Sequence, residues 1–121
     1  MSINSIAYTY MIGDLFHYGH LSLLQQARKI SDYHITGVIT DEVAEAWQAI
    51  NISNYKERKP VIEHITLVDK VLKQDSMDPT NNLKKIHNKY PDAKIILFHA
   101  SSKGCLMLAE TYHYKTVCKT Y

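Results

Sequence analysis

The sequence predicts an α/β fold with a mostly parallel sheet flanked by helices, and two observations lead to this prediction. Runs of β-branched and aromatic residues alternate along the chain with segments in which apolar residues recur at helical spacing. Such alternation is typical of strands that are joined through helices in a parallel sheet. The chain has 121 residues and no visible repeat or linker, so we expect a single domain over residues 1–121.

The first part of the chain predicts a strand, a helix and a second strand. Residues 6–12 are β-branched and aromatic, and Gly13 and Asp14 end this strand. From about residue 20 to residue 30 the apolar side chains share one face of a helix, with polar side chains on the other. Residues 33–40 then predict the second strand.

The middle of the chain predicts a helix whose start is ambiguous. Asn54 and Glu57 have the spacing of a capping box, and apolar residues continue at helical spacing over residues 61–68. Pro60 lacks a backbone donor and conflicts with a continuous helix that begins at the capping box. Either the first turn is irregular, or the regular helix begins at about Lys59 with Pro60 at its first position.

The remaining segments complete the alternation of strands and helices. Residues 43–51 fit either a short helix or a loop. The later elements are expected as a strand at 68–72, a helix at 79–90, a buried strand at 93–98, a helix at 104–110 and a strand at 114–117.

Charge and composition argue against several classes of protein. The net charge is only +2, and the basic run at 84–89 is expected to coat the solvated side of a helix, so we expect no nucleic-acid partner. The longest strongly apolar stretch, 95–98, is too short for a membrane span, and residues 1–4 do not resemble a signal peptide. We therefore expect a cytoplasmic location and no membrane partner. Cys105 and Cys118 are expected to be reduced thiols.

The chemistry is expected in the loops that follow the first two strands, which end at Asp14 and Asp41, because ligands of parallel α/β sheets bind beyond the carboxyl ends of the strands. His17 and His20 lie three residues apart where the first helix starts, so both can project in one direction. A phosphate is attracted to free backbone donors at a helix start, and Gly19 would let it approach the backbone closely. Imidazole donors beside it would stabilise charge on phosphoryl oxygens.

These residues belong to a longer pattern that can be matched without insertions over residues 6–73. Its blocks, in chain order, are 13–21, 23–24, 27–28, 31–33, 38–42, 54–59 and 68–71. The pattern resembles the nucleotidyltransferases that carry a His-x-Gly-His motif, and in particular their cytidylyltransferase family, exemplified by the glycerol-3-phosphate cytidylyltransferases. The resemblance implies a Rossmann-like nucleotidyltransferase fold.

The resemblance also implies a reaction and its participants. A phosphate or phosphonate oxygen of a small acceptor attacks the α-phosphorus of a nucleoside triphosphate, most simply CTP, and pyrophosphate leaves without a covalent enzyme intermediate. Mg²⁺ accompanies the triphosphate and neutralises part of its charge. Members of the family commonly form homodimers, and the apolar segment 61–71 is a candidate contact.

Residue roles follow from the same resemblance. His17 and His20 are expected to be catalytic and to stabilise the transition state. The residues expected to bind the nucleotide are Gly13, Asp14, Phe16, Gly19 and Arg58.

Each of these roles has an alternative. Asp14 could instead cap its loop, and Arg58 could make only a salt bridge on its helix. Asp41 and Glu42 fit a turning or capping role better than a catalytic one. The two histidines could be ordinary hydrogen-bonded residues or two metal ligands, although no further cluster in the sequence completes a metal site.

The chain departs from the family pattern in three places. Residues 43–53 contain no basic residue, although the family usually carries phosphate-binding lysines there. The loop after the strand at 93–98 differs as well, and its Lys103 is predicted to supply the absent charge and bind the nucleotide. The closing Ser/Thr signature of the family has no match. These departures leave three hypotheses: an active enzyme, a non-catalytic nucleotide- or phosphometabolite-binding module, or a domain completed by a longer polypeptide.

Overall fold

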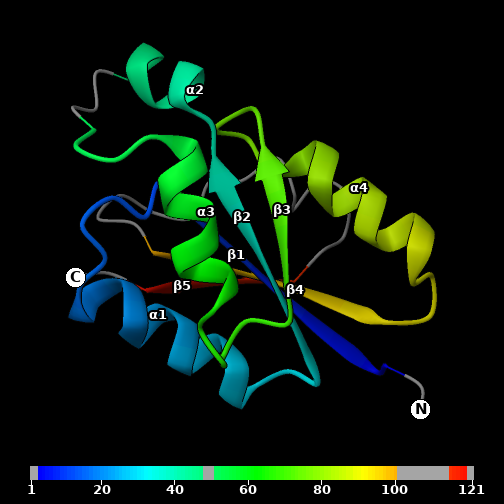
Figure 1. Cartoon of the computed structure of the whole chain (residues 1–121). Helices are drawn as coiled ribbons and strands as arrows, with labels where there is room; N and C mark the ends of the chain where they lie inside the picture. The colour runs from blue at the N-terminus through cyan, green and yellow to red at the C-terminus, as the bar shows by residue number, and fades with distance from the viewer. Residues whose placement is uncertain (1–2, 48–50, 101–114, 120–121) are drawn as a thin grey trace.

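Five parallel strands form one sheet in the order β3-β2-β1-β4-β5 in the computed structural model (Figure 1). The structure describes residues 3–47, 51–100 and 115–119. The strands are β1 (Ser5–Met11), β2 (Tyr33–Ile39), β3 (Lys70–Gln74), β4 (Lys94–Ala100) and β5 (Lys115–Lys119). The predicted α/β class with a parallel sheet is confirmed.

Helices cover both faces of this sheet. They are α1 (Tyr18–Lys29), α2 (Asp41–Ala46), α3 (Tyr55–Glu63) and α4 (Thr80–Lys89). The helices α1 and α3 lie on one face and α4 lies on the other (Figure 1). The strand order reverses between β1 and β4, so the carboxyl end of β1 lies at the position where sheets of this type bind ligands.

The core has two layers because successive residues of a strand point to opposite faces of the sheet. Ala7 and Met11 of β1 pack with α1 and α3, whereas Ile6 and Tyr8 pack with α4. All four side chains are buried. A central parallel strand covered on both faces is expected to be largely apolar along its length, and the buried polar exception within β1, Thr9, has its hydroxyl hydrogen-bonded to His34 and Thr36.

The helix α3 resolves the ambiguity at Pro60. It begins at Tyr55 and contains Pro60, so a regular helix starting at about residue 59 is wrong. The capping box is present: Asn54 and Glu57 each accept the other's backbone N–H at 3.0 Å. An interior proline destabilises a helix by about 3 kcal/mol. The cap stabilises α3 by about 1 kcal/mol, and burial of Ile62 stabilises it by about 2 kcal/mol. Since Pro60 is also solvent-exposed, the helix tolerates it.

Two further boundaries differ from the sequence-based expectation. Residues 65–68 form a turn rather than the end of α3, because the backbone N–H of Val68 donates to the carbonyl of Ile65 at 3.0 Å. The strand β3 consequently begins at Lys70 instead of residue 68. It begins where the chain meets β2, since the N–H of Asp69 donates to the carbonyl of His34 at 2.9 Å.

The other elements agree more closely. The ambiguous segment at 43–51 contains part of α2, and the helix and strand expected at 79–90 and 93–98 are α4 and β4. The helix expected at 104–110 lies outside the described residues. Within the part of the chain that the structure describes, no helix has the length and apolarity that crossing a membrane requires.

Candidate functional site

The loop between β1 and α1 turns sharply to bring its histidines to the carboxyl edge of the sheet. Gly13 has a φ of +75°, and a Cβ atom there would lie 2.6 Å from Cδ1 of Ile62, so the turn requires glycine. Leu15 has a φ of 46° and is 64% exposed. A positive φ is uncommon for a residue with a side chain, and such strain is concentrated at functional loops.

His17 and His20 form a reciprocal cap at the start of α1. The backbone N–H of Gly19 donates to Nδ1 of His17 at 3.0 Å, and the backbone N–H of His17 donates to Nδ1 of His20 at 3.1 Å. An Nδ1 atom that accepts a hydrogen bond carries no proton, so each neutral ring carries its proton on Nε2. The cap therefore fixes both tautomers and leaves both Nε2–H groups as donors.

The two imidazole rings lie close together and next to an aromatic ring. Their centroids are 4.1 Å apart, and the ring of Phe16 stacks on His20 at 5.1 Å. Partial burial, and to a smaller extent the charge of His17, lower the pKa of His20. The environment thus favours a neutral His20 that donates from Nε2.

Asp14 holds a neighbouring loop in place. Its carboxylate accepts the backbone N–H groups of Ile52 and Ser53 at 2.7 and 2.9 Å. These bonds hold the pKa of the Asp14 carboxyl below its ordinary value. Asp14 therefore joins the loop after β1 to the loop before α3, and a contact with the nucleotide stays a prediction.

Arg58 is buried, and its guanidinium faces backbone carbonyls. The residue is 1% exposed. Its Nη1 donates to the carbonyls of Ile12 and Ile39, and its Nε donates to the carbonyl of Ser53. Ile12 follows β1 and Ile39 ends β2, so one side chain joins the carboxyl ends of the two neighbouring strands. A direct contact of Arg58 with a phosphate stays a prediction.

The ion pair of Arg58 is formed with Asp41 rather than within its own helix. Nη2 of Arg58 lies 2.7 Å from Oδ1 of Asp41. The same carboxylate accepts the backbone N–H of Tyr55 at the start of α3 at 3.0 Å, whereas the helix that follows Asp41 in the chain, α2, is capped by Thr40. The hydrogen bond from Arg58, followed by that from Tyr55, lowers the pKa of Asp41. The sequence gave no sign of this ion pair or of the contact with Tyr55, since the partners lie on different elements.

The structure therefore brings together Gly13, Asp14, Phe16, His17, Gly19, His20 and Arg58 around the carboxyl ends of β1 and β2. Lys103 lies outside the described residues. One exposed aromatic side chain at this edge was given no role in the sequence analysis: Tyr18 at the start of α1 is 77% exposed. Among the described residues, no group of three His, Cys, Asp or Glu side chains is arranged to hold a metal ion.

Comparison with known proteins is consistent with this geometry. A family model described as cytidylyltransferase-like matches residues 13–114. The chain is 40% identical over 70 residues to the glycerol-3-phosphate cytidylyltransferase of Bacillus spizizenii, covering 58% of this chain and 54% of that protein. It is 41% identical over 64 residues to the Staphylococcus aureus protein of the same name, covering 53% of this chain and 48% of that protein. The chain thus spans about half the length of these relatives.

Similarity to solved structures extends over the whole chain. The lipopolysaccharide core biosynthesis protein from Thermoplasma volcanium GSS1 superposes with a TM-score of 0.70 at 17% identity, covering 98% of this chain and 96% of that one. A Vibrio parahaemolyticus structure assigned as a nicotinate-nucleotide adenylyltransferase gives a TM-score of 0.67 at 16% identity, covering 97% and 74%. At such identities the likeness shows the fold alone, and it confirms the expected Rossmann-like nucleotidyltransferase fold.

Proposed function

The chain belongs to the cytidylyltransferase-like family, and we propose that it transfers CMP from CTP to a small phosphate or phosphonate acceptor with release of pyrophosphate. One observation carries the proposal. His17 and His20 are held by backbone amides through Nδ1, so both present an Nε2–H donor at the carboxyl edge of the sheet. Two fixed donors beside a helix start suit a phosphate chain that gains charge during transfer.

The reaction needs no covalent intermediate and no general base. An acceptor oxygen, already deprotonated in a phosphate or phosphonate, forms a bond to the α-phosphorus. The bond from the α-phosphorus to the bridging oxygen breaks, and its electron pair leaves with pyrophosphate. Negative charge increases on the oxygens nearest the departing group, where the Nε2–H donors of His17 and His20 would stabilise it.

Mg²⁺ is proposed to enter with the triphosphate as part of the substrate. A triphosphate carries more negative charge than two neutral imidazoles can offset, and a bound divalent cation neutralises part of it. Lys103, which follows β4 in the sequence, is proposed to add further positive charge. Lys103→Ala should therefore weaken CTP binding, and unchanged affinity would exclude this role.

The observation that favours a non-catalytic function is that the guanidinium of Arg58 is occupied by groups of the protein. Its guanidinium binds carbonyls and Asp41, and residues 43–53 contain no basic residue. A site with few cations would bind a nucleotide or phosphometabolite without turning it over. The second candidate is thus a non-catalytic binding module of the same family.

A pyrophosphate-release assay separates the two candidates. The protein is incubated with Mg²⁺, each of the four ribonucleoside triphosphates and a panel of phosphate and phosphonate acceptors. We expect CTP-dependent release that is lost in His17→Ala and His20→Ala and retained in His64→Ala, which removes a histidine at the end of α3. Absence of histidine-dependent release, together with a nucleotide-induced rise in Tm, would support the binding module instead.

A homodimer is proposed with its contact near the start of segment 61–71. Val61 is 53% exposed, whereas Ile62 and Val68 belong to the core and offer little surface. Light scattering of the wild type should give the mass of a dimer, and Val61→Asp should shift it toward the monomer. A monomeric wild type would exclude this assembly.

A further inference from the structure

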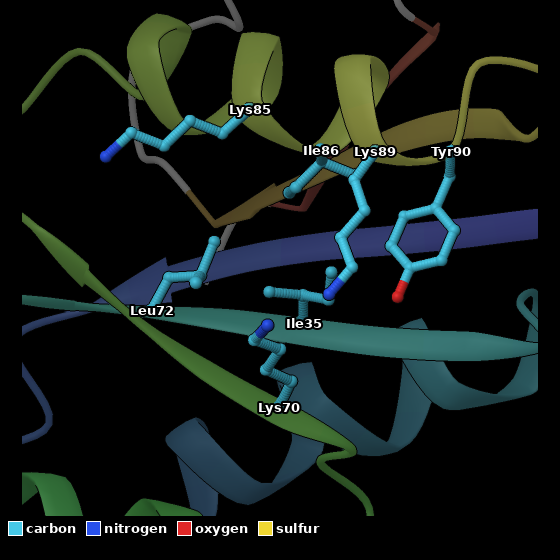
Figure 2. A pocket seen from close by; sticks show the side chains of 7 residues that line it. All are labelled: Ile35, Lys70, Leu72, Lys85, Ile86, Lys89 and Tyr90. Atoms are coloured by element: carbon cyan, nitrogen blue, oxygen red, sulfur yellow. The ribbon is translucent and has the colours of Figure 1, made fainter.

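A shallow pocket with a volume of about 80 Å³ lies between α4 and the sheet, on the face opposite to α1 and α3 (Figure 2). Its lining residues come from β2, β3 and the C-terminal part of α4: Ile35, Lys70, Leu72, Lys85, Ile86, Lys89 and Tyr90. Lys70 is the first residue of β3 and pairs with Ile35 of β2. The pocket is therefore near the amino end of β3, away from the histidine pair at the carboxyl edge.

The floor of this pocket is apolar. Ile35 and Ile86 are buried, Leu72 is half-buried, and all three side chains border the pocket. A concave apolar surface with a few polar groups at its rim is the usual construction of a small-molecule site. The volume of about 80 Å³ is well below the roughly 300 Å³ of a site that encloses its whole ligand, so a ligand would lie partly in the pocket and partly in solvent. The pocket would take the edge of an aromatic ring or a short aliphatic chain.

Positive charge enters the pocket from two elements. Lys70 extends from β3 and Lys89 extends from α4, and their ammonium groups converge over Ile35 (Figure 2). The ammonium group of Lys89 also lies 5.6 Å from the centre of the Tyr90 ring. Lys85 is one helical turn before Lys89 and borders the same pocket.

No acidic side chain neutralises these lysines in the part of the chain that the structure describes. The ion pairs found there are Arg28–Asp69, Arg58–Asp41 and Lys59–Glu63. Like charges one helical turn apart, as on Lys85 and Lys89, destabilise a helix. A bound anion would offset this repulsion.

We propose that this pocket binds a small organic anion with an apolar body. The body lies on the floor formed by Ile35, Leu72 and Ile86, and a phosphate, carboxylate or sulfonate group lies between Lys70 and Lys89. This site is independent of the proposed nucleotidyl transfer at the histidine pair. It also revises the expectation for residues 84–89, since Lys85 and Lys89 border a pocket as well as solvent.

The probe for this proposal is 8-anilino-1-naphthalenesulfonate, which combines an aromatic body with one sulfonate and fluoresces in apolar surroundings. Titration of the full chain should give saturable, one-to-one binding that weakens with added salt. The Lys70→Met/Lys89→Met variant should bind about tenfold more weakly, because two partly exposed ion pairs are lost while apolar stems remain. Lys56→Met removes one positive charge from α3 on the other face, as Lys89→Met does from α4, and should leave the affinity unchanged.

A second probe separates charge recognition from apolar binding. N-phenyl-1-naphthylamine has the same aromatic body without the sulfonate, and it should bind more weakly and without salt dependence. The single variant Lys89→Met changes an exposed side chain and keeps the test valid if the double variant does not fold. The proposal is overturned if the lysine variants bind the sulfonate as tightly as the wild type, or if the neutral probe binds equally well.

Discussion

The histidine pair and Arg58 lie at the same edge of the sheet, but they use their hydrogen-bond donors differently. The histidines leave donors available to a ligand, whereas Arg58 directs its donors to groups inside the protein. His17 is exposed, and its capping bonds leave Nε2–H donors for a ligand. Arg58 is buried, and its donors bind the carbonyls that end β1 and β2. The two histidines can therefore act on a ligand, whereas Arg58 holds together the strand ends from which the site loops begin. Substitutions at the two places should have different consequences.

The largest expected effect is on stability, at Arg58. Replacing Arg58 with Met leaves the Asp41 carboxylate and the carbonyls of Ile12 and Ile39 without their donor. Leaving a buried carbonyl without its donor costs about 1–3 kcal/mol in the free energy of unfolding, and two carbonyls lose their donor here, whereas the Asp41 carboxylate is 36% exposed and is screened by water. Urea unfolding followed by circular dichroism measures this loss. A loss below about 1 kcal/mol would show that the buried guanidinium does not hold the strand ends together.

The next effect is on turnover, at the histidine pair. His17→Ala and His20→Ala each remove one Nε2–H donor, and loss of such a donor reduces the rate by about 10² to 10³. The loss of the helix cap should lower stability by only about 1 kcal/mol. Pyrophosphate release measures the loss of turnover, and urea unfolding of the same samples measures the loss of stability. Turnover that survives both substitutions would remove the histidines from the mechanism.

A smaller effect separates capping from chemistry within His17 itself. Asparagine is a good N-cap residue and can accept the backbone N–H of Gly19, but it offers no imidazole donor. His17→Asn should therefore be close to the wild type in stability and as slow as His17→Ala in pyrophosphate release. Recovery of turnover by asparagine would mean that the cap, not the donor, is what the reaction requires.

The smallest expected effect is a dependence of stability on pH. The pKa of His20 is below its ordinary value of 6.5, so the unfolded chain binds more protons and stability falls as the pH drops through that value. Burial lowers the pKa of His34 as well, which adds a contribution of the same sign. His20→Ala should reduce the slope of Tm against pH below about pH 7 without abolishing it. An unchanged slope would contradict the depressed pKa of His20.

Sequence patterns predicted the features that depend on neighbouring residues. The strand before Gly13, the start of α1 and the capping box at Asn54 all follow from short-range spacing, and the structure contains each of them. The start of β3 was predicted two residues early, because it is set by pairing with the distant strand β2 rather than by local composition.

The inward direction of Arg58 could not be predicted for a related reason. It depends on where the carbonyls of Ile12 and Ile39 meet after the sheet has formed. The pocket beside α4 likewise joins Lys70 and Lys89, which are distant in the chain and belong to different elements. Only the folded arrangement shows that their charges converge.

The orientation of the histidine pair is the central claim, and nitrogen-15 NMR of the imidazole rings tests it most directly. Spectra of the wild type at neutral pH should show both His17 and His20 as the tautomer protonated on Nε2. Addition of Mg²⁺ and CTP should shift both Nε2 resonances and leave the Nε resonance of Arg58 in place. Protonation of either ring on Nδ1, or Nε2 resonances that CTP does not move, would contradict a pair of outward-facing donors.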